Sequence, residues 1–225
     1  MARPRVLITG FGPFPGVAEN PSAWLAETFA ARPAEFDCEL RARVLPTEWE
    51  AVALMPRLYE TLQPHVMIHF GLSERATTFR IEKSAHNRVA LRADARGALP
   101  ATPTIRNPGP DRFDTTLPAA SLAAHLRMRG LPAVTSRSAG RYLCNFLYYH
   151  SLDWARGRTE TPLILFVHIP PQSGGASPFR EQTLLDGARE ILRFALAFAS
   201  EQKPAKAALG PAFARGEAGS PARDA

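Results

Sequence analysis

The sequence predicts an α/β fold: one domain with a mostly parallel central sheet that helices cover on both faces. Strand-like and helix-like segments alternate along most of the 225 residues, as they do in chains built from strand–helix–strand units. The composition is that of a globular protein, since 45% of the residues are hydrophobic and 21% are charged. We find no internal repeat and expect a single domain over residues 1–202.

Three strands are predicted in the first third of the chain. Residues 5–9 form a short apolar run that ends at Gly10, and residues 65–71 form another buried run. Residues 38–45 alternate charged and apolar side chains, as a half-buried strand does. These segments supply the first strands of the sheet.

Two helix starts separate these strands. Asn20 and Pro21 predict the first, because Asn caps free backbone amides and Pro suits the first helical position. Residues 47–50, TEWE, have the spacing of a capping box and are followed by apolar residues at helical intervals. We therefore expect one helix after each of the first two strands.

The second half begins with a less regular stretch, residues 72–115, which is rich in Arg, Pro, Thr and Asp. We expect one strand there near residues 89–92 and a turn at residues 107–110. Regular elements then return, with predicted helices over residues 117–129, 143–154 and 178–199 and predicted strands over residues 133–135 and 163–169. The last stretch, residues 203–225, is rich in Ala, Pro, Gly and charge, and we expect it to be disordered.

Charge does not favour a nucleic-acid partner. The net charge is +6, from 27 Lys and Arg against 21 Asp and Glu, and part of the excess lies in residues 203–225. There is no basic stripe and no RNA-reading aromatic motif, so a basic balance alone is a weak argument. We interpret the excess as solvated surface and expect no nucleic-acid partner.

Cysteine content and hydrophobicity indicate the compartment. Cys38 and Cys144 are the two cysteines, too few for a disulfide framework or a four-cysteine zinc site, and free thiols suit a reducing cytosol. No apolar run approaches the roughly 18 residues that cross a bilayer. The first residues lack the hydrophobic core and cleavage site of a secretory leader. We expect a soluble, cytoplasmic protein with no membrane partner.

A glycine-rich segment, GFGPFPG at residues 10–16, follows the first predicted strand. Its spacing is wrong for a dinucleotide-binding loop, and Pro13 and Pro15 lack the amide protons that such a loop donates. A rigid loop that presents Phe11 and Phe14 fits better. These two rings either seal the core or line a flat apolar pocket.

The two cysteines differ in context. Cys144 follows a glycine turn and precedes an apolar helical pattern, so we place it in the first turn of a helix, where free amides and the dipole favour a thiolate. Cys38 lies in an alternating strand with no such context, which favours a structural role. Helix position alone does not separate a reactive thiol from inert packing at Cys144.

Histidine and carboxylate candidates for acid–base chemistry are also present. His168 ends the most apolar predicted strand, and sites in open α/β sheets collect at the carboxyl ends of strands. It is either a hydrogen-bonded core histidine or a catalytic one. Glu82 precedes Lys83, and from spacing alone a surface ion pair is the ordinary interpretation. No close His and Cys spacing indicates a metal site.

Together these segments resemble pyroglutamyl peptidase I, the pyrrolidone-carboxylate peptidase family of cysteine peptidases. The likeness covers roughly residues 5–200 and rests on several motifs in a fixed order. They are GFGPF at 10–14 with NPS at 20–22, the acid segment at 82–87, the segment at 109–118, SAG with CN at 138–145, LYY at 147–149, and FVHIP at 166–170.

This resemblance implies a three-layer αβα sandwich and a Cys-His-Glu triad that removes N-terminal pyroglutamate (5-oxoproline) from peptides. It makes Cys144 the nucleophile, His168 the base and acid, and Glu82 the group that orients His168. It implies no metal and no organic cofactor. The partner it implies is a peptide with a blocked N-terminus, and the family often forms homo-oligomers, commonly tetramers.

The resemblance also implies a substrate pocket. A neutral lactam has no ammonium group to bind, so its pocket needs apolar walls and a few backbone hydrogen bonds. Arg92 matches a family arginine near the nucleophile that supports the oxyanion or the thiolate. Four residues match family positions that line the pocket: Phe11, Phe14, Tyr142 and Leu143.

One loop departs from the family pattern. Leu72 replaces a Gln, although its backbone carbonyl can still serve the lactam, and Glu74 and Arg75 replace a glycine pair. The departure leaves two alternatives beside the peptidase. One is a thiol hydrolase with shifted acyl specificity, and the other is a non-catalytic protein that binds a lactam or an acyl-peptide on the same fold.

Overall fold

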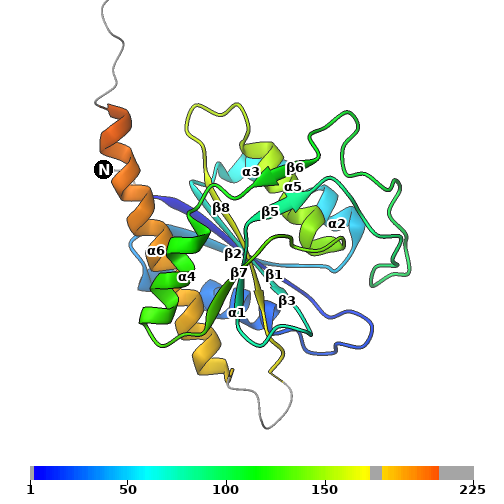
Figure 1. The fold of residues 1–225 in the computed structure, drawn as a ribbon, viewed down its shortest axis with the longest axis horizontal. Coiled ribbons are helices and arrows are strands. Elements are labelled where there is room, and N and C mark those ends of the chain that lie inside the picture. Colours follow the sequence, from blue (N-terminus) through cyan, green and yellow to red (C-terminus); the bar gives the residue numbers. More distant parts are fainter. Residues whose placement is uncertain (1–2, 173–178, 208–225) are drawn as a thin grey trace, which may run out of the picture.

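The computed structural model describes residues 3–172 and 179–207, and the strands in these residues form two sheets (Figure 1). The larger has six strands in the order β2-β1-β3-β8-β4-β7, and the smaller pairs β5 with β6. The strands are Arg5–Phe11 (β1), Glu39–Leu45 (β2), Val66–Leu72 (β3), Phe79–Glu82 (β4), Ser84–His86 (β5), Arg112–Asp114 (β6), Ala133–Ser136 (β7) and Leu163–Ile169 (β8).

The larger sheet is mostly parallel. Its pairs β1–β2, β1–β3, β3–β8 and β4–β7 are parallel, and β4–β8 is antiparallel. The last strand in the chain, β8, therefore lies between β3 and β4 and joins the two parts of the sheet. This arrangement confirms the predicted mostly parallel α/β fold.

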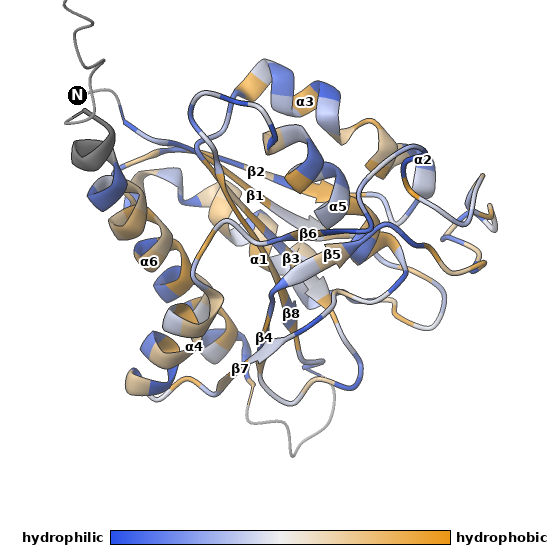
Figure 2. Cartoon of the chain, turned by 45° about the horizontal axis from the view of Figure 1, so that its top comes forward, coloured by the Kyte–Doolittle hydropathy of each residue, from blue (hydrophilic) through white to orange (hydrophobic). Residues whose placement is uncertain are grey.

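Helices cover both faces of the sheet, which completes the three layers of an αβα sandwich (Figures 1 and 2). One face of the sheet shares a core with α1, α4 and α6, and the other face shares a core with α2, α3 and α5. The helices are Pro21–Ala31 (α1), Trp49–Ala53 (α2), Met55–Leu62 (α3), Ala119–Met128 (α4), Leu143–Ala155 (α5) and Glu181–Ala207 (α6), with a short 3-10 turn at Pro33–Glu35.

Alternation along each strand divides the apolar side chains between the two cores. In β1, Val6 and Ile8 pack with α1 and α6, whereas Leu7 packs against the α5 layer. Successive side chains of a strand point to opposite faces, so a strand covered on both faces is apolar along most of its length. Figure 2 shows the result as orange along the central strands and mixed blue and orange along α6.

The helix starts differ in how far they match expectation. Asn20 caps α1 as predicted, since its side chain accepts a hydrogen bond from the Ser22 amide at 3.1 Å. The predicted capping box at residues 47–50 is wrong. Thr47 donates instead to the Gly12 carbonyl, and Asp94, from a distant loop, accepts from the Trp49 amide at 3.0 Å. A tertiary contact has replaced the local cap.

The irregular stretch contains the largest errors. The strand expected near residues 89–92 is absent from the structure, because the amides there bond outside any ladder: Val89 to the Pro103 carbonyl and Ala90 to the Arg141 carbonyl. Three short strands that were not predicted, β4, β5 and β6, form on either side of it. The turn at residues 107–110 contains a cis peptide bond between Asn107 and Pro108.

The last helix extends further toward the C-terminus than predicted. The predicted last helix began at residue 178, which lies outside the described residues, and α6 begins at Glu181. Residues 203–207, expected to start the disordered tail, continue α6, and residues 208–225 lie outside the described part. In the described residues, none of the helices combines the length and apolar character needed to cross a membrane.

Candidate active site

Strand alternation brings an acid and a base to one face of the sheet. In β8, Phe166 packs in the α5 core, so His168 two residues later faces the same layer. In β4, Ile81 packs in the opposite core, so the adjacent Glu82 faces the α5 layer. Residues Glu82 and Phe166 are paired in the antiparallel register of these strands. Because side chains two residues apart in a strand share a face, His168 lies diagonally opposite Glu82 on the same face of the sheet.

The helix α5 supplies the thiol to the same face. Gly140 has φ +87°, a left-handed conformation that glycine adopts without steric cost, and the chain then turns into α5. The helix begins at Leu143, so Cys144 is its second residue, as predicted. The unpaired amides of a first helical turn and the helix dipole stabilise negative charge at this position.

The sulfur lies directly against the sheet. A Cβ atom added at Gly71 of β3 would lie 3.0 Å from Cys144 Sγ and 2.8 Å from the Phe166 ring. Real Cβ atoms are rarely that close to another heavy atom, so a side chain at position 71 would displace the sulfur or the ring. Glycine at this position lets the start of α5 approach the end of β3.

The three predicted triad residues form a continuous chain of contacts. His168 Nδ1 lies 2.8 Å from Glu82 Oε1, and Glu82 is fully buried. His168 also makes a side-chain hydrogen bond with Cys144, for which the ring has Nε2 left. Since the imidazole is held between a carboxylate and a thiol, it can move a proton between sulfur and a leaving group while keeping its orientation.

The charge of the neighbours decides the protonation of His168. Burial by itself lowers the pKa of this histidine, but the charge and hydrogen bond of Cys144 and the hydrogen bond and charge of Glu82 raise it to about 9. An imidazolium is therefore favoured at neutral pH while Cys144 carries its negative charge. This is the state in which a thiolate can attack a carbonyl and a proton is ready for the leaving amine.

Two buried polar side chains of α5 fix Glu82 relative to Cys144. Asn145 is fully buried and bonds the segment after β4: it accepts from the His86 amide at 2.8 Å and donates to the His86 and Arg88 carbonyls at 2.8 and 3.0 Å. Tyr148 donates to the Glu82 carbonyl at 3.1 Å. These bonds tie the first turns of α5 to the strand that carries Glu82.

The triad candidates open into a cavity of about 520 Å³ at the carboxyl ends of the parallel strands. Its lining includes Glu82, Cys144 and His168. It also includes the six residues predicted to bind substrate, which are Phe11, Phe14, Leu72, Arg92, Tyr142 and Leu143. All nine predicted site residues therefore lie around one cavity.

The aromatic loop is one wall of this cavity. Phe11 ends β1 and is buried, while Phe14 is half-buried and makes reciprocal backbone bonds with Val17. The Gly12 carbonyl between the two rings accepts hydrogen bonds from the Asn20 amide group at 3.0 Å and the Thr47 hydroxyl at 2.9 Å. The rings are thus presented by a backbone held from two sides.

Tyr142 and Arg92 form another wall. The Arg92 guanidinium lies 4.6 Å from the centre of the Tyr142 ring, and the Tyr142 hydroxyl donates to the Ala93 carbonyl at 3.0 Å. The Trp49 ring packs edge-on against Tyr142, with ring centres 5.3 Å apart. Arg92 is therefore stacked beside the entrance to α5, and its role toward an oxyanion or thiolate stays a prediction.

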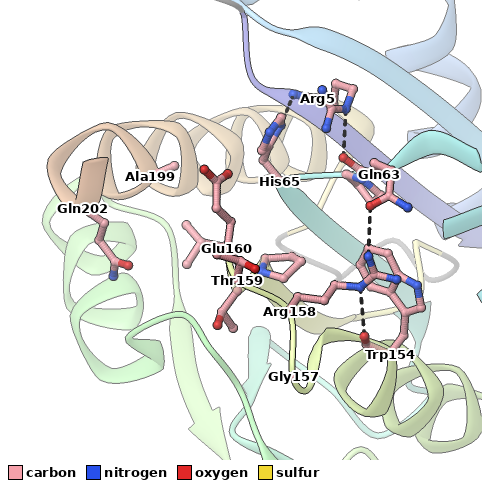
Figure 3. A pocket seen from close by; sticks show the side chains of 14 residues that line it. Arg5, Gln63, His65, Trp154, Gly157, Arg158, Thr159, Glu160, Ala199 and Gln202 are labelled. Carbon is pink, nitrogen blue, oxygen red and sulfur yellow. Dashed lines mark hydrogen bonds between the residues drawn. The ribbon is translucent and has the colours of Figure 1, made fainter. Parts of the chain in front are cut away.

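A second cavity lies at the opposite end of the sheet, near the starts of β1 and β8 (Figure 3). Some of its polar groups bond one another: Arg5 donates to the Gln63 backbone carbonyl at 2.8 Å, and Arg158 donates to the Gln63 side chain at 3.0 Å and stacks on Trp154. No triad candidate lines it. Within residues 3–172 and 179–207, no group of His, Cys, Asp and Glu side chains is arranged to hold a metal ion.

Known proteins are similar to this chain over most of its length. The family model described as pyroglutamyl peptidase matches residues 4–174. The chain belongs to the pyroglutamyl peptidase family. It is 36% identical over 177 residues to pyroglutamyl-peptidase 1 of Rattus norvegicus, covering 76% of this chain and 82% of that one. It is 34% identical over 214 residues to the pyrrolidone-carboxylate peptidase of Clavibacter michiganensis subsp. michiganensis, covering 92% and 99%.

Solved structures of the pyroglutamyl peptidase family share the fold. The pyrrolidone carboxyl peptidase of Thermococcus litoralis superposes with a TM-score of 0.81 at 27% identity, covering 88% of this chain and 96% of that one. The Bacillus amyloliquefaciens pyroglutamyl peptidase I gives a TM-score of 0.77 at 26% identity, covering 86% and 97%. The three-layer architecture is therefore that of the family.

Against this family background, the loop from β3 to β4 carries the departure seen in the sequence. Ser73 donates to the Ile169 carbonyl at 3.0 Å, and Ala76 closes a turn onto the Ser73 carbonyl at 2.9 Å. Glu74 and Arg75, which stand in place of the family's glycine pair, are exposed and line the cavity. The altered loop thus borders the site.

Sequence reasoning gave no role to Asn145, Arg80 or Arg141, although Arg80 and Arg141 line the cavity. Asn145 was not singled out, although an Asn within a helical segment is unfavourable unless it bonds something, and that was the available signal. Arg80 also lines the cavity, and it was missed because β4 itself was not predicted.

Proposed function

We propose that this protein is a cysteine peptidase that removes N-terminal pyroglutamate from peptides. The observation that carries the proposal is the contact chain Cys144–His168–Glu82, which opens into a cavity walled by Phe11 and Phe14 in a chain of this family. The aromatic wall that Phe11 and Phe14 form suits a neutral five-membered lactam. The same chain of contacts supplies the groups that hydrolysis needs.

In the proposed mechanism, the Cys144 thiolate attacks the carbonyl carbon of the pyroglutamyl residue. His168 then gives its proton to the departing amine, and the C–N bond breaks to leave a pyroglutamyl thioester on Cys144. His168, now neutral, takes a proton from water, whose oxygen attacks the thioester and releases pyroglutamate. Glu82 keeps the ring in one orientation and supports its charged form throughout.

The direct test is hydrolysis of a pyroglutamyl-arylamide by the folded protein in the presence of a reductant. We expect turnover without added metal or organic cofactor. Absence of turnover would reject pyroglutamyl peptidase activity. A panel of other acyl-arylamides tests the shifted thiol hydrolase that the Glu74 and Arg75 loop suggests; faster cleavage of another acyl group would favour that alternative.

Relatives named as peptidases do not favour a non-catalytic binding protein. The two hypotheses differ in thiol chemistry, because a binding protein needs no activated sulfur. Iodoacetamide at mildly acidic pH should label Cys144 much faster than Cys38, which is buried and whose pKa burial raises. Equally slow labelling of both thiols would support the binding protein.

We also propose the cytoplasm as the compartment and a homo-oligomer as the assembly. The first is supported by two free cysteines, since such thiols persist in reducing conditions. The second rests on the family resemblance alone. Light scattering of the purified protein tests assembly, and a monomer mass would reject the oligomer; cell fractionation tests the compartment.

A further inference from the structure

We propose that Arg80 and Arg75 bind a carboxylate on the residue that follows the scissile bond. The preferred substrates are then pyroglutamyl peptides whose second residue carries a negative charge, such as dipeptides with a free carboxyl group. The inference rests on the proposed peptidase function and deepens it, because it concerns the leaving side of the same site. It is carried by the position of Arg80, by its spare hydrogen-bond donors and by the charge of the cavity.

Arg80 lies where the leaving group must be. In the antiparallel pairing of β4 with β8, Arg80 is directly opposite His168. Side chains of such a pair share one face of the sheet, with Cβ atoms about 4.5–5.5 Å apart. His168 has to reach the departing amine to protonate it, so the first residue of the leaving peptide lies beside Arg80.

A carboxylate on that residue comes close to the amine by covalent geometry. In a pyroglutamyl dipeptide, the free α-carboxylate is separated from the amine nitrogen by a single carbon atom. An acidic side chain at the same residue extends only one or two carbons further from the backbone. Either carboxylate can therefore reach a guanidinium beside His168, whereas a neutral amide or arylamide offers no charge there.

The guanidinium of Arg80 has donors to spare. Its Nη2 donates to the Ser136 hydroxyl at 3.1 Å, and its Nε forms an ion pair with Glu82 Oε1 at 3.9 Å, too long for a hydrogen bond. That Nε is buried and has no hydrogen-bond partner in the described structure. Of the five N–H donors of a guanidinium, the two on Nη1 and the second on Nη2 make no hydrogen bond within the described residues and are the ones a ligand can use. With 38% of its side chain exposed, the residue is accessible from the cavity.

The charge of the residues around Arg80 also favours an anionic ligand. Four arginines line the cavity, Arg75, Arg80, Arg92 and Arg141, against the two carboxylates of Glu74 and Glu82. Glu82 is already engaged by His168. In the described residues, Arg75, Arg92 and Arg141 make no ion pair, and Arg92 stacks on Tyr142. A cavity with unpaired positive charge attracts and orients an anionic substrate.

Arg75 adds a second donor on the same approach. It lies on the loop between β3 and β4, at the place where the family has a glycine pair, and it is exposed to the cavity. Its charge adds to that of Arg80 on the cavity wall. Planar guanidinium groups bind carboxylates through paired hydrogen bonds, which a lysine cannot reproduce.

The experiment compares kcat/KM for three substrates that differ only on the leaving side. Pyroglutamyl-alanine has a free α-carboxylate, pyroglutamyl-alanine amide has none, and pyroglutamyl-glutamate amide has a side-chain carboxylate. We expect at least one charged substrate to exceed the neutral amide by about 10-fold, the effect of one charged hydrogen bond. The two charged substrates distinguish a chain-terminal carboxylate from a side-chain one. The advantage should shrink in high salt, which screens exposed charges.

The variants Arg80→Met and Arg75→Met should lower the ratio of kcat/KM for a charged substrate to kcat/KM for the neutral amide. Arg80→Met should bring this ratio close to 1. A ratio is the right measure because Arg80 is near Glu82, and an effect on the triad would change all three substrates alike. Arg57→Met is the matched control. Arg57 is exposed on α3, makes none of the ion pairs found in the described residues and does not line the cavity, so its removal should leave the ratio unchanged.

Each outcome bears on a different statement. Turnover of the neutral amide with no advantage for either charged substrate overturns this inference and leaves the peptidase proposal standing. An advantage that survives both Arg80→Met and Arg75→Met overturns the assignment to these arginines. Absence of turnover for every pyroglutamyl substrate, arylamide included, overturns the proposed function and this inference with it. If Arg80→Met fails to fold, Arg75→Met and the salt dependence still decide.

Discussion

Two buried histidines on neighbouring strands of the same sheet have opposite protonation. His69 of β3 is fully buried, and burial lowers its pKa to about 3. His168 of β8 is buried almost as deeply; burial lowers its pKa too, but Cys144 and Glu82 outweigh it and bring the value to about 9. The difference teaches that the charge of the partners, and not depth in the fold, decides which imidazole is charged.

The surroundings of His69 contain only neutral partners. The Ser151 hydroxyl donates to the Leu147 carbonyl at 2.8 Å, so its oxygen is free to accept from His69 Nε2 at 3.0 Å. The Thr9 hydroxyl lies 2.8 Å from His69 Nδ1 and can donate to it. The Tyr59 hydroxyl, 2.8 Å from Ser151, completes the chain. A neutral imidazole satisfies every one of these bonds, whereas an imidazolium would have a donor facing Thr9 in place of an acceptor.

The largest effect is expected when the sulfur of Cys144, which raises the pKa of His168, is removed. Cys144→Ala should lower turnover on the order of 10⁴–10⁶-fold, because the nucleophile of a coupled triad is lost. The pKa of His168 should fall as well, because burial is then opposed by Glu82 alone. Assays with a pyroglutamyl-arylamide and NMR titration of the ring measure the two effects. The matched Cys38→Ala variant should keep most of the turnover, and the reverse pattern would refute the nucleophile assignment.

A smaller effect is expected when the carboxylate partner is neutralised. Glu82→Gln keeps the shape of the side chain, so the fold should persist, but turnover should fall about 10²–10⁴-fold as orientation and charge support are lost. The rate of the parent should decline as pH rises through about 9, where His168 loses its proton. In Glu82→Gln this decline should occur at lower pH. An unchanged rate and pH profile would remove Glu82 from the mechanism.

His69 should contribute to acid sensitivity of the fold. Its pKa is near 6.5 when unfolded and about 3 when folded, so the unfolded chain binds the extra proton and stability falls as pH drops from 6.5 toward 3. The expected loss at pH 4 is roughly 3 kcal/mol. Urea unfolding at pH 7 and pH 4 measures it, and His69→Gln should show an acid loss smaller by about that amount. Equal acid losses in parent and variant would contradict this assignment.

The smallest effect tests the Ser151 hydroxyl, which accepts from His69 Nε2. Ser151→Ala removes the acceptor shared by His69 and Tyr59 and leaves buried donors unpaired, which should cost about 1–3 kcal/mol of unfolding free energy. Ser200→Ala, on the exposed face of α6, is the control and should change stability by less than about 0.5 kcal/mol. Urea unfolding at neutral pH compares them. A Ser151→Ala protein as stable as the control would show that the bonds are dispensable.

The parallel core of the fold could be predicted because long, apolar strands such as β3 and β8 dominate it. Strands β4, β5 and β6 could not, because they have three or four residues and carry Arg, Glu, Ser, His and Asp. Their strand state depends on pairing with β8 and β7 or with each other, which no local pattern encodes. The hydrogen bond from the Trp49 amide to Asp94 at the start of α2 could not be predicted either, because Asp94 lies 45 residues further along the chain.

The site shows the same division between local and long-range information. The position of Cys144 in a first helical turn and of His168 at a strand end followed from local patterns. Glu82 did not, and only the family resemblance selected it among the acids. The cross-strand place of Arg80 and the buried environment of His69 depend on which strands become neighbours. The sequence alone could not separate a core histidine from a catalytic one, because the charged partner comes from another strand.

The central position of β8 has a consequence for biosynthesis. This strand is translated after every other strand of the larger sheet, yet it joins β3 to β4. A growing chain can pair β1 with β2 and β3, but the two parts of the sheet meet only once residues 163–169 have been made. Cys144 therefore leaves the ribosome before His168, its proposed catalytic base. On the proposed mechanism, the thiol of each nascent chain lacks its base until the sheet closes, so hydrolytic activity would report a completed sheet.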